Sequence, residues 1–306
     1  MTATPLRIRA RWLGIGLSAA LWAMPVPAAF AAPDQIPSVV ETPTSEHHVG
    51  KMIWADLVTP DLEGAKRFYT ALFGWTFRDV PTGPSTYAVA SLDGRPVAGV
   101  LGRAARPDEH RQPAWLTFIA VSDVDAAKAT AIGHGAKVLL EPKTFPSRGR
   151  QAVFADPDGA VFAVLASSRG DPADFLAAPG EWIWSSLLAS DPNASAAFYQ
   201  TLLGYDVYDL ETEGGADHLI LSTDDYARAS VVTLPAGSHR HPHWLNFVRV
   251  LDTASAAAKV TALGGRVLVQ PHLDRHGGMV AVVADPAGAP FGLMEWTDSD
   301  TKVEPK

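Results

Sequence analysis

The chain has 306 residues, of which 47% are hydrophobic and 19% are charged, an ordinary balance for a globular protein with room for two modest domains, each with its own core. The formal net charge is −8, and no stretch concentrates lysine and arginine. We therefore expect no nucleic-acid partner, because binding nucleic acid requires a clustered basic surface. The absence of cysteine excludes disulfides, thiol nucleophiles and cysteine-ligated metal clusters.

The N-terminus has the pattern of a secretory signal peptide. Three arginines before residue 12 form a basic start, and residues 12–24 are an uncharged, mostly apolar run. This run is too short to cross a bilayer, which takes about 20 residues. Small residues at 29–31 then suit a signal peptidase. We expect residues 1–31 to be removed and the mature protein to be periplasmic or secreted, without membrane contact. The alternatives are a mis-called start codon and a retained membrane anchor.

Three further segments lack a sustained hydrophobic period. Residues 32–48 are rich in Pro, Thr, Ser and Val and are interpreted as a flexible tether. Residues around 170–180 are rich in Pro, Gly and Ala and are interpreted as a linker. Residues 298–306 are polar and are expected to form a frayed tail.

An internal repeat organises the rest of the chain. Residues 53–57, Ile-Trp-Ala-Asp-Leu, are matched 130 positions later by residues 183–187, Ile-Trp-Ser-Ser-Leu. Ala-Asp-Pro at 155–157 is matched at an offset of 129 by Ala-Asp-Pro at 284–286. The repeat predicts two homologous domains. Their boundaries are expected at 49–168 and 179–297.

Within the first domain, one order of elements occurs twice. Strand 51–59 is apolar and rich in β-forming residues, and Asp61 then lies where it can cap a helix. An apolar stripe at helical spacing runs from Ala65 to Leu72, and Gly74 ends the helix. The remaining predicted elements are strands near 75–80, 86–91, 95–101 and 115–121, a helix at 123–132, and strands near 137–140, 151–155 and 160–165.

This βαβββ order, with Asp, Phe-Tyr and Gly around the first helix and Ala-Asp-Pro before the last strand, resembles the vicinal-oxygen-chelate superfamily of glyoxalases, bleomycin-resistance proteins and extradiol dioxygenases. The motif residues are Asp61, Phe68, Tyr69, Gly74 and 155–159 in the first domain, and Asp191, Phe198, Tyr199, Gly204 and 284–288 in the second. The resemblance implies an α+β fold in which four βαβββ modules form two tandem glyoxalase-like domains with cupped mixed sheets. It implies little about activity, because these residues serve turns and packing.

Catalytic members of the superfamily hold a divalent metal through His and Glu on the first, fourth, fifth and eighth strands, so the resemblance can be tested for metal chemistry. The corresponding first-, fifth- and eighth-strand positions hold Trp54, Leu116 and Ala163 in the first domain, and Trp184, Leu245 and Gly292 in the second. Residues 95–101, on the fourth strand, contain no carboxylate or imidazole. Since none of these side chains coordinates a cation, we expect neither the family metal nor another cofactor.

By strand alternation, the concave faces of the two sheets present aromatic and apolar side chains. We define cup 1 by Trp54, Asp56, Leu116 and Phe118, and cup 2 by Trp184, Ser186, Leu245 and Phe247. Aromatic walls with few polar groups suit a small, partly apolar or aromatic ligand. The sequence thus predicts an exported glyoxalase-like protein that binds such a molecule without a metal. The alternative is that the aromatic rings pack the two domains together or fill the cups themselves.

Asp56 is a candidate catalytic residue. It lies two residues from Trp54 and therefore shares its face of the strand. A carboxylate on an apolar wall can act as a general base, and pairing with Arg95 or Arg148 is the alternative. Its counterpart in the second domain is Ser186, so the two cups need not do the same thing.

An alternative metal site consists of His239, His241 and His243, which alternate along one segment. A solvated loop is the other interpretation. Two further functions therefore stay open. The first is an enzyme of the lyase, dioxygenase or hydroxylase type, either metal-dependent through unaligned ligands or metal-free through Asp56. The second is an interaction protein with occluded cups. The sequence also leaves a homo-oligomer open.

Overall fold

The computed structural model describes residues 36–82, 85–103, 112–209, 218–235, 241–274 and 278–296. The expected signal peptide at 1–31 and tail at 298–306 lie outside these residues. Among the described residues, no helix is long and apolar enough to cross a membrane.

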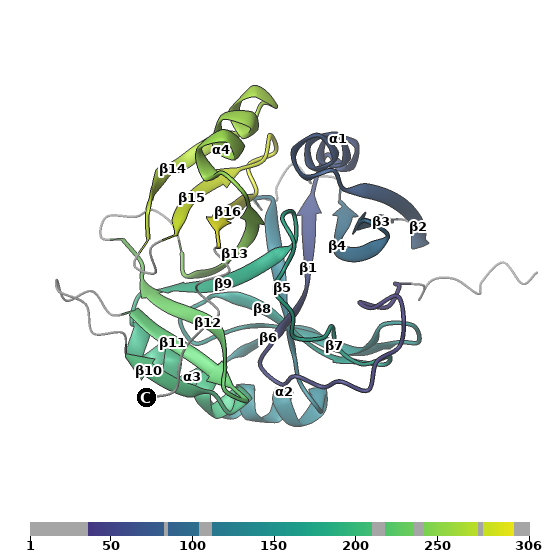
Figure 1. Ribbon diagram of the computed structural model, residues 1–306. Helices are drawn as coiled ribbons and strands as arrows, with labels where there is room; N and C mark the ends of the chain where they lie inside the picture. Colours follow the sequence, from purple (N-terminus) through teal and green to yellow (C-terminus); the bar gives the residue numbers. More distant parts are fainter. Residues whose placement is uncertain are drawn as a thin grey trace, which may run out of the picture. The chain divides into compact units, whose positions relative to one another are not determined.

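The elements repeat the βαβββ order four times, once per module (Figure 1). In the first domain they are β1 (Met52–Thr59), α1 (Leu62–Phe73), β2 (Thr76–Thr82), β3 (Ser85–Leu92), β4 (Arg95–Gly102), β5 (Ala114–Ala120), α2 (Val124–Gly133), β6 (Lys137–Phe145), β7 (Gly149–Ala155) and β8 (Val161–Ser167). In the second domain they are β9 (Trp182–Ala189), α3 (Pro192–Leu203), β10 (Asp206–Asp209), β11 (His218–Thr223), β12 (Tyr226–Thr233), β13 (His243–Val250), α4 (Thr253–Ala262), β14 (Arg266–Leu273), β15 (Met279–Ala284) and β16 (Pro290–Glu295).

Each domain forms one eight-stranded mixed sheet. The strand order is β2-β3-β4-β1-β5-β8-β7-β6 in the first domain, and the second domain repeats it as β10-β11-β12-β9-β13-β16-β15-β14. The first strand pairs parallel with the fourth and antiparallel with the fifth, so the two modules of a domain meet at its centre. The α+β fold of two tandem cupped-sheet domains is therefore confirmed.

The helix ends follow the predicted chemistry. The Asp61 side chain accepts a hydrogen bond of 2.8 Å from the Gly64 amide, which satisfies a free N–H in the first turn of α1. Gly74 ends the helix with φ of 80°, a left-handed conformation that favours glycine. The apolar stripe from Ala65 to Leu72 is buried against the sheet.

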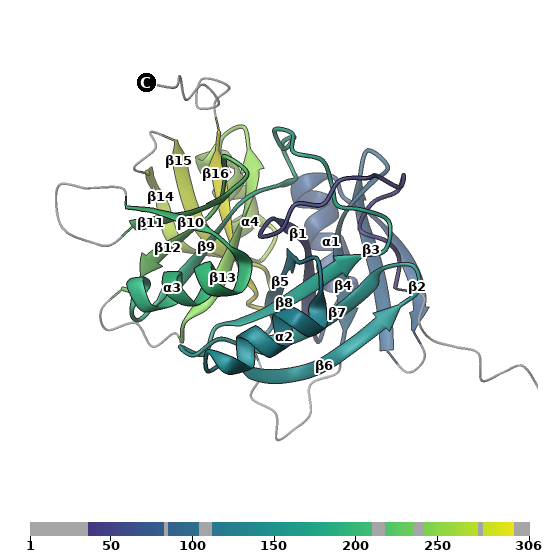
Figure 2. The same ribbon diagram turned by 90° about the horizontal axis from the view of Figure 1, so that it is seen from below.

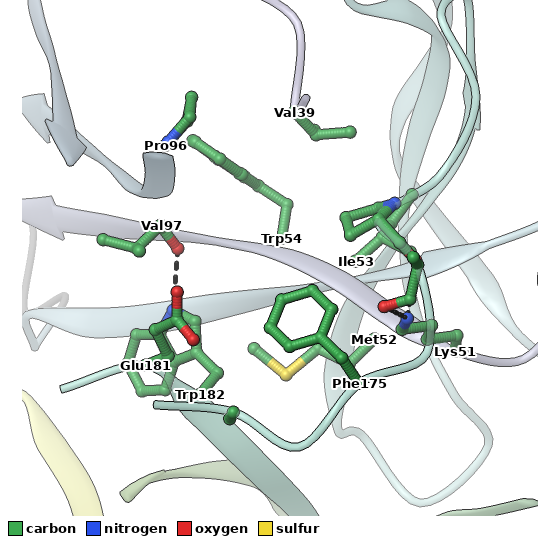
Figure 3. A pocket seen from close by; sticks show the side chains of 13 residues that line it. Val39, Lys51, Met52, Ile53, Trp54, Pro96, Val97, Phe175, Glu181 and Trp182 are labelled. Atoms are coloured by element: carbon green, nitrogen blue, oxygen red, sulfur yellow. Dashed lines mark hydrogen bonds between the residues drawn. The ribbon is translucent and has the colours of Figure 1, made fainter. Parts of the chain in front are cut away.

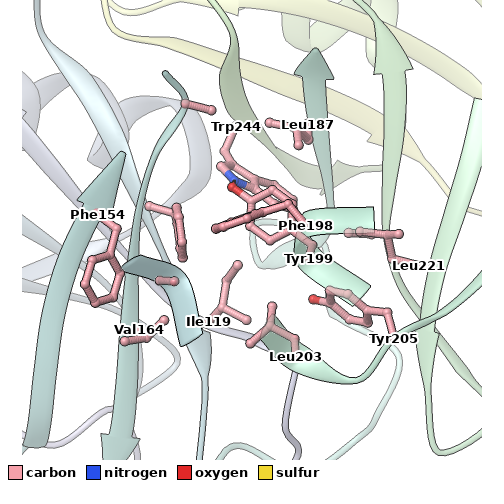
Figure 4. Packing of buried hydrophobic residues seen from close by; sticks show 14 of the residues in the cluster. Ile119, Phe154, Val164, Leu187, Phe198, Tyr199, Leu203, Tyr205, Leu221 and Trp244 are labelled. Atoms are coloured by element: carbon pink, nitrogen blue, oxygen red, sulfur yellow. Dashed lines mark hydrogen bonds between the residues drawn. The ribbon is translucent and has the colours of Figure 1, made fainter. Parts of the chain in front are cut away.

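The domains share their cores, which differs from the expectation that each domain has its own. One hydrophobic cluster combines the second module of the first domain with the first module of the second domain and includes Trp244 of β13 (Figure 4). The other combines residues of the two remaining modules and includes Trp115 of β5. Helix α1 accordingly contacts α4, and α2 contacts α3, as both views of the ribbon show (Figures 1 and 2). The helix-covered faces of the sheets therefore face one another, and the cups lie on the opposite faces.

Two reciprocal hydrogen bonds join the family motifs across this shared core. The Tyr199 hydroxyl donates to the Asp156 carboxylate at 3.0 Å, and it accepts from the Trp244 indole at 2.9 Å. The Tyr69 hydroxyl donates in the same way to the Asp285 carboxylate at 3.3 Å. Burial raises the pKa of both aspartates above the usual value. The Phe-Tyr and Asp-Pro motifs thus connect the domains as well as forming turns.

The described part of the expected tether is packed against the domains. Val39 is only 3% exposed and lies in the hydrophobic cluster of cup 1. Further along, the Thr44 amide donates to the Arg169 carbonyl at 2.9 Å, and Lys51 pairs with Asp174 of the linker at 2.9 Å. The apolar side chains of this Pro-rich stretch pack against the domains. In a freely moving tether they would be exposed to water.

Candidate functional site

The strand register brings each set of predicted cup residues together. In the first domain Trp54 lies opposite Phe118, and Asp56 lies opposite Leu116. The second domain repeats this arrangement. There Trp184 lies opposite Phe247, and Ser186 lies opposite Leu245. A register shift at Ile53 in the first domain and at Ile183 in the second occurs just before the tryptophan, so the irregularity is part of the repeat.

In cup 1 Asp56 is held by hydrogen bonds rather than facing an open ligand site. Its Oδ1 atom accepts from the Trp54 indole and from the Tyr87 hydroxyl, both at 2.7 Å. Burial raises the pKa of Tyr87, so this phenol stays protonated and remains a donor. Gly99 lies opposite Asp56 on β4, and a Cβ there would collide with the Tyr87 hydroxyl and the Asp56 carboxylate. Glycine is therefore needed at this position for the network to form.

Arg148 completes the cup 1 network and is 0% exposed. Its Nη2 atom donates to the Tyr87 hydroxyl at 2.9 Å, so it reaches Asp56 through the phenol. Its guanidinium carbon lies 4.7 Å from the centre of the Trp54 ring, a cation–π distance. The other arginine considered as a partner of Asp56, Arg95, instead binds Glu181 at 2.8 Å.

Sequence reasoning did not identify Tyr87 as a cup residue. Strand alternation could have found it, because Tyr87 and Val89 lie two residues apart and share the cup 1 cluster, whereas Ala90 is buried in the cluster on the helix-covered side.

The N-terminal segment, which we define as residues 36–48, covers cup 1 with its first residues. Ile36, Val39 and Val40 pack with Trp54 and Phe118 in one cluster. A cavity of about 130 Å³ remains beside Val39 and Trp54 (Figure 3). Its other lining residues are Lys51, Met52, Ile53, Pro96, Val97, Pro172, Ala173, Phe175, Ala177, Glu181 and Trp182. Cup 1 is therefore largely filled by its own aromatic ring and by the chain's N-terminal segment.

Cup 2 has a different surface. The Trp184 ring is partly exposed and stacks on Trp296, with ring centres 6.4 Å apart and planes at 28°. Its indole N–H donates to the Ser230 hydroxyl at 3.1 Å, and this hydroxyl lies 2.8 Å from that of Ser186. Within the described part of the chain, the cluster in this cup contains only residues of its own sheet and Trp296. At the repeat offset of 129, Gly277 replaces Arg148.

The family's metal does not fit the residues at its expected positions. In the first domain these positions hold Trp54, Leu116 and Ala163, whose side chains are not metal ligands. On the neighbouring fourth strand, the Asp56 and Tyr87 side chains fill the space beside Gly99. In the second domain the Phe247 ring lies over Gly292, where a Cβ would collide with it. Within the described ranges, no three histidines or carboxylates gather as a metal site. The Glu295 carboxylate on β16 accepts a hydrogen bond of 2.7 Å from the Thr253 amide, in the first turn of α4.

The alternative histidine site falls partly outside the described residues, because His239 is not described. His241 is exposed. The Nδ1 atom of His243 lies 2.8 Å from the His241 carbonyl oxygen, a contact that engages one ring nitrogen.

Comparison with known proteins agrees with this architecture. The model of the glyoxalase/bleomycin resistance protein/dioxygenase superfamily matches residues 47–164, and a glyoxalase-like domain model matches residues 185–294. The protein named "Putative glyoxylase CFP32" of Mycobacterium tuberculosis is 33% identical over 82% of this chain and 97% of its own. Anthracycline biosynthesis protein DnrV of Streptomyces peucetius is 33% identical over 80% of this chain and 93% of its own.

Solved structures share the fold at low identity. The Mn(II)-bound glyoxalase from Novosphingobium aromaticivorans has a TM-score of 0.57 at 19% identity, covering 81% of this chain and 82% of that one. The 2,3-dioxygenase LapB from Pseudomonas sp. KL28 has a TM-score of 0.57 at 16% identity, covering 82% and 94%. The chain belongs to the glyoxalase/bleomycin resistance protein/dioxygenase superfamily, with two such domains in tandem.

Proposed function

We propose that the protein is exported and binds a small, flat, partly aromatic molecule in cup 2 without the superfamily's metal. The observation that carries this proposal is the Trp184 ring, which is partly exposed and stacks on Trp296. Trp184 stands at the position that corresponds to the superfamily's first metal ligand. Two relatives, DauV and DnrV, are named as anthracycline biosynthesis proteins. Anthracyclines contain a flat fused-ring system, which is the shape that an aromatic wall suits.

The polar groups of cup 2 support the same ligand class. The hydroxyls of Ser186 and Ser230 can each donate or accept a hydrogen bond. The Trp296 indole N–H is buried and has no hydrogen-bond partner among the described residues. A buried donor without an acceptor is unfavourable, and a ligand oxygen would relieve it. A flat ring bearing oxygen substituents would thus stack on Trp184 and meet donors at its edge.

Titration with 1,4-dihydroxyanthraquinone, followed by quenching of tryptophan fluorescence, tests this proposal. A stacked ring contributes about 1 kcal/mol beyond its buried area. Trp184→Leu, which loses both stacking and contact area, should therefore weaken binding about tenfold or more. Tyr208→Leu is the matched control, because Tyr208 is an exposed aromatic residue of the same domain. Equal affinities for Trp184→Leu and Tyr208→Leu would rule out cup 2 as the site.

An enzyme is the second candidate, favoured by the polar network in cup 1. Asp56, Tyr87 and Arg148 place a carboxylate, a phenol and a guanidinium within one hydrogen-bonded chain. Such a set can move a proton, provided that a substrate reaches it. Turnover of a carbonyl substrate that is lost in Asp56→Asn and kept in Trp184→Leu would favour this candidate over binding in cup 2.

A further inference from the structure

The N-terminal segment occupies cup 1 in the manner of a bound ligand. Its aliphatic side chains lie in the same cluster as Trp54 and Phe118, and Val39 is almost fully buried. The segment meets the polar part of the cup through one backbone oxygen. The Arg148 Nε atom donates a hydrogen bond of 2.8 Å to the Pro37 carbonyl. The segment thus presents an apolar body and one carbonyl oxygen to the cup.

Arg148 is a buried donor with unused capacity. Two of its nitrogens donate to the Pro37 carbonyl and the Tyr87 hydroxyl. The third, Nη1, is buried and has no partner among the described residues. A fully buried arginine is uncommon because desolvating its charge is costly, and each N–H left without an acceptor adds to that cost. Cup 1 therefore favours an occupant that brings an acceptor oxygen to the Arg148 guanidinium.

We propose that cup 1 is a binding site for a neutral, apolar carbonyl compound, and that residues 36–40 are an intramolecular ligand that excludes it. The Pro37 carbonyl is the chemical stand-in for the ligand's oxygen. The ligand is neutral because Arg148 already has a counter-ion in Asp56, which it reaches through the Tyr87 hydroxyl. A second carboxylate would have to be desolvated beside the first one. This site is separate from cup 2 and does not depend on it.

The test opens cup 1 by a substitution in the segment. Val39→Lys would place an ammonium group in an apolar cluster, so the segment should leave the cup. Thr42→Lys adds the same charge at an exposed position of the same segment and is the matched control. Hydrogen exchange of residues 36–48 reports on release, and the probe is 1-tetralone, a bicyclic ketone. Because occupation by the segment lowers the competent fraction, Val39→Lys should bind 1-tetralone at least about tenfold more tightly than the wild type.

Two comparison probes test the recognised group. Tetralin has the same ring system without the oxygen, and it should bind Val39→Lys about tenfold more weakly than 1-tetralone because the hydrogen bond to Arg148 is missing. Tetrahydro-1-naphthoate adds a carboxylate, and it should also bind more weakly. Trp184→Leu in the same background should leave the gain intact, which separates this site from cup 2.

Three outcomes would overturn the proposal. The first is a segment that stays protected from exchange in Val39→Lys. The second is faster exchange with no rise in affinity for 1-tetralone. The third is equal affinity for 1-tetralone and tetralin. If Val39→Lys does not fold, Val39→Ser provides a milder polar change at the same buried position, with Thr42→Ser as its control and the same criteria.

Discussion

Removing the Tyr199 hydroxyl should reveal how strongly the two domains depend on each other. Tyr199 is fully buried, and its hydroxyl joins the Trp244 indole to the Asp156 carboxylate of the other domain. Tyr199→Phe keeps the ring contacts and deletes only this oxygen. It leaves a buried indole N–H without an acceptor and removes one donor from a buried carboxylate.

The expected loss follows from the two bonds. A hydrogen bond to a charged group contributes about 1.5–3 kcal/mol, and an orphaned buried donor costs about 1 kcal/mol or more, so the free energy of unfolding should fall by about 2–4 kcal/mol. For a protein of this size that corresponds to a drop in Tm of roughly 5–10 °C. The exposed Tyr208 provides the control Tyr208→Phe, which should change stability by less than about 0.5 kcal/mol.

The loss should also depend on pH. Burial raises the pKa of Asp156, and the hydrogen bond from Tyr199 partly offsets this. Tyr199→Phe removes that offset, so the pKa rises further. A carboxyl whose folded pKa lies above its unfolded value stabilises the fold below the unfolded pKa, and this contribution is lost as pH rises through the folded pKa. The deficit of Tyr199→Phe should therefore be larger at pH 7 than at pH 4.

Urea unfolding of wild type, Tyr199→Phe and Tyr208→Phe at both pH values measures these effects. If Tyr199→Phe is no less stable than Tyr208→Phe, the hydrogen bond between the domains contributes nothing. If its deficit is the same at pH 4 and pH 7, the ionised Asp156 carboxylate is not the partner that matters.

Four further predictions concern other parts of the chain. Fragment 49–168 should show a lower Tm than the whole protein, because the structure shares both hydrophobic cores between the domains; an equal Tm would show independent domains. Gly99→Ala should lower stability in urea by about 1–3 kcal/mol through its collision in cup 1, whereas Gly133→Ala, with open space around it, should not. N-terminal sequencing of exported protein should find a start near Ala32 rather than Met1. Added zinc, nickel or manganese should not raise the Tm, although a specific site would add about 2.7 kcal/mol at one hundred times its Kd.

The features that local pattern predicts well are those set by neighbouring residues. Asp61 is predicted to begin a helix and Gly74 to end it. Both predictions are confirmed, because the Asp61 side chain accepts a hydrogen bond from the first turn and Gly74 has a left-handed backbone. The shared face of Trp54 and Asp56 follows from strand alternation alone. The tandem domains followed from the repeat offset. In each case the physical cause lies within a few residues or in the repeat itself.

The features that the pattern missed depend on residues far apart in the chain. Tyr69 and Asp285 are 216 positions apart. Packing within its own domain already explains Tyr69, and a turn explains Asp285, so neither residue predicts the hydrogen bond between them. Arg148 was considered as a partner of Asp56, but its bond to Pro37 could not be foreseen from a Pro-rich stretch without hydrophobic period. Short aliphatic stretches reveal no partner until a surface that buries them is known.

A structure of the protein crystallised with 1,4-dihydroxyanthraquinone in the presence of manganese tests the metal-free account of cup 2 most directly. The account predicts the ligand's ring stacked on Trp184, its oxygens near Ser186 and the Trp296 indole, and no manganese between ligand and protein. A manganese ion that bridges the ligand's oxygens to protein side chains in cup 2 would contradict it.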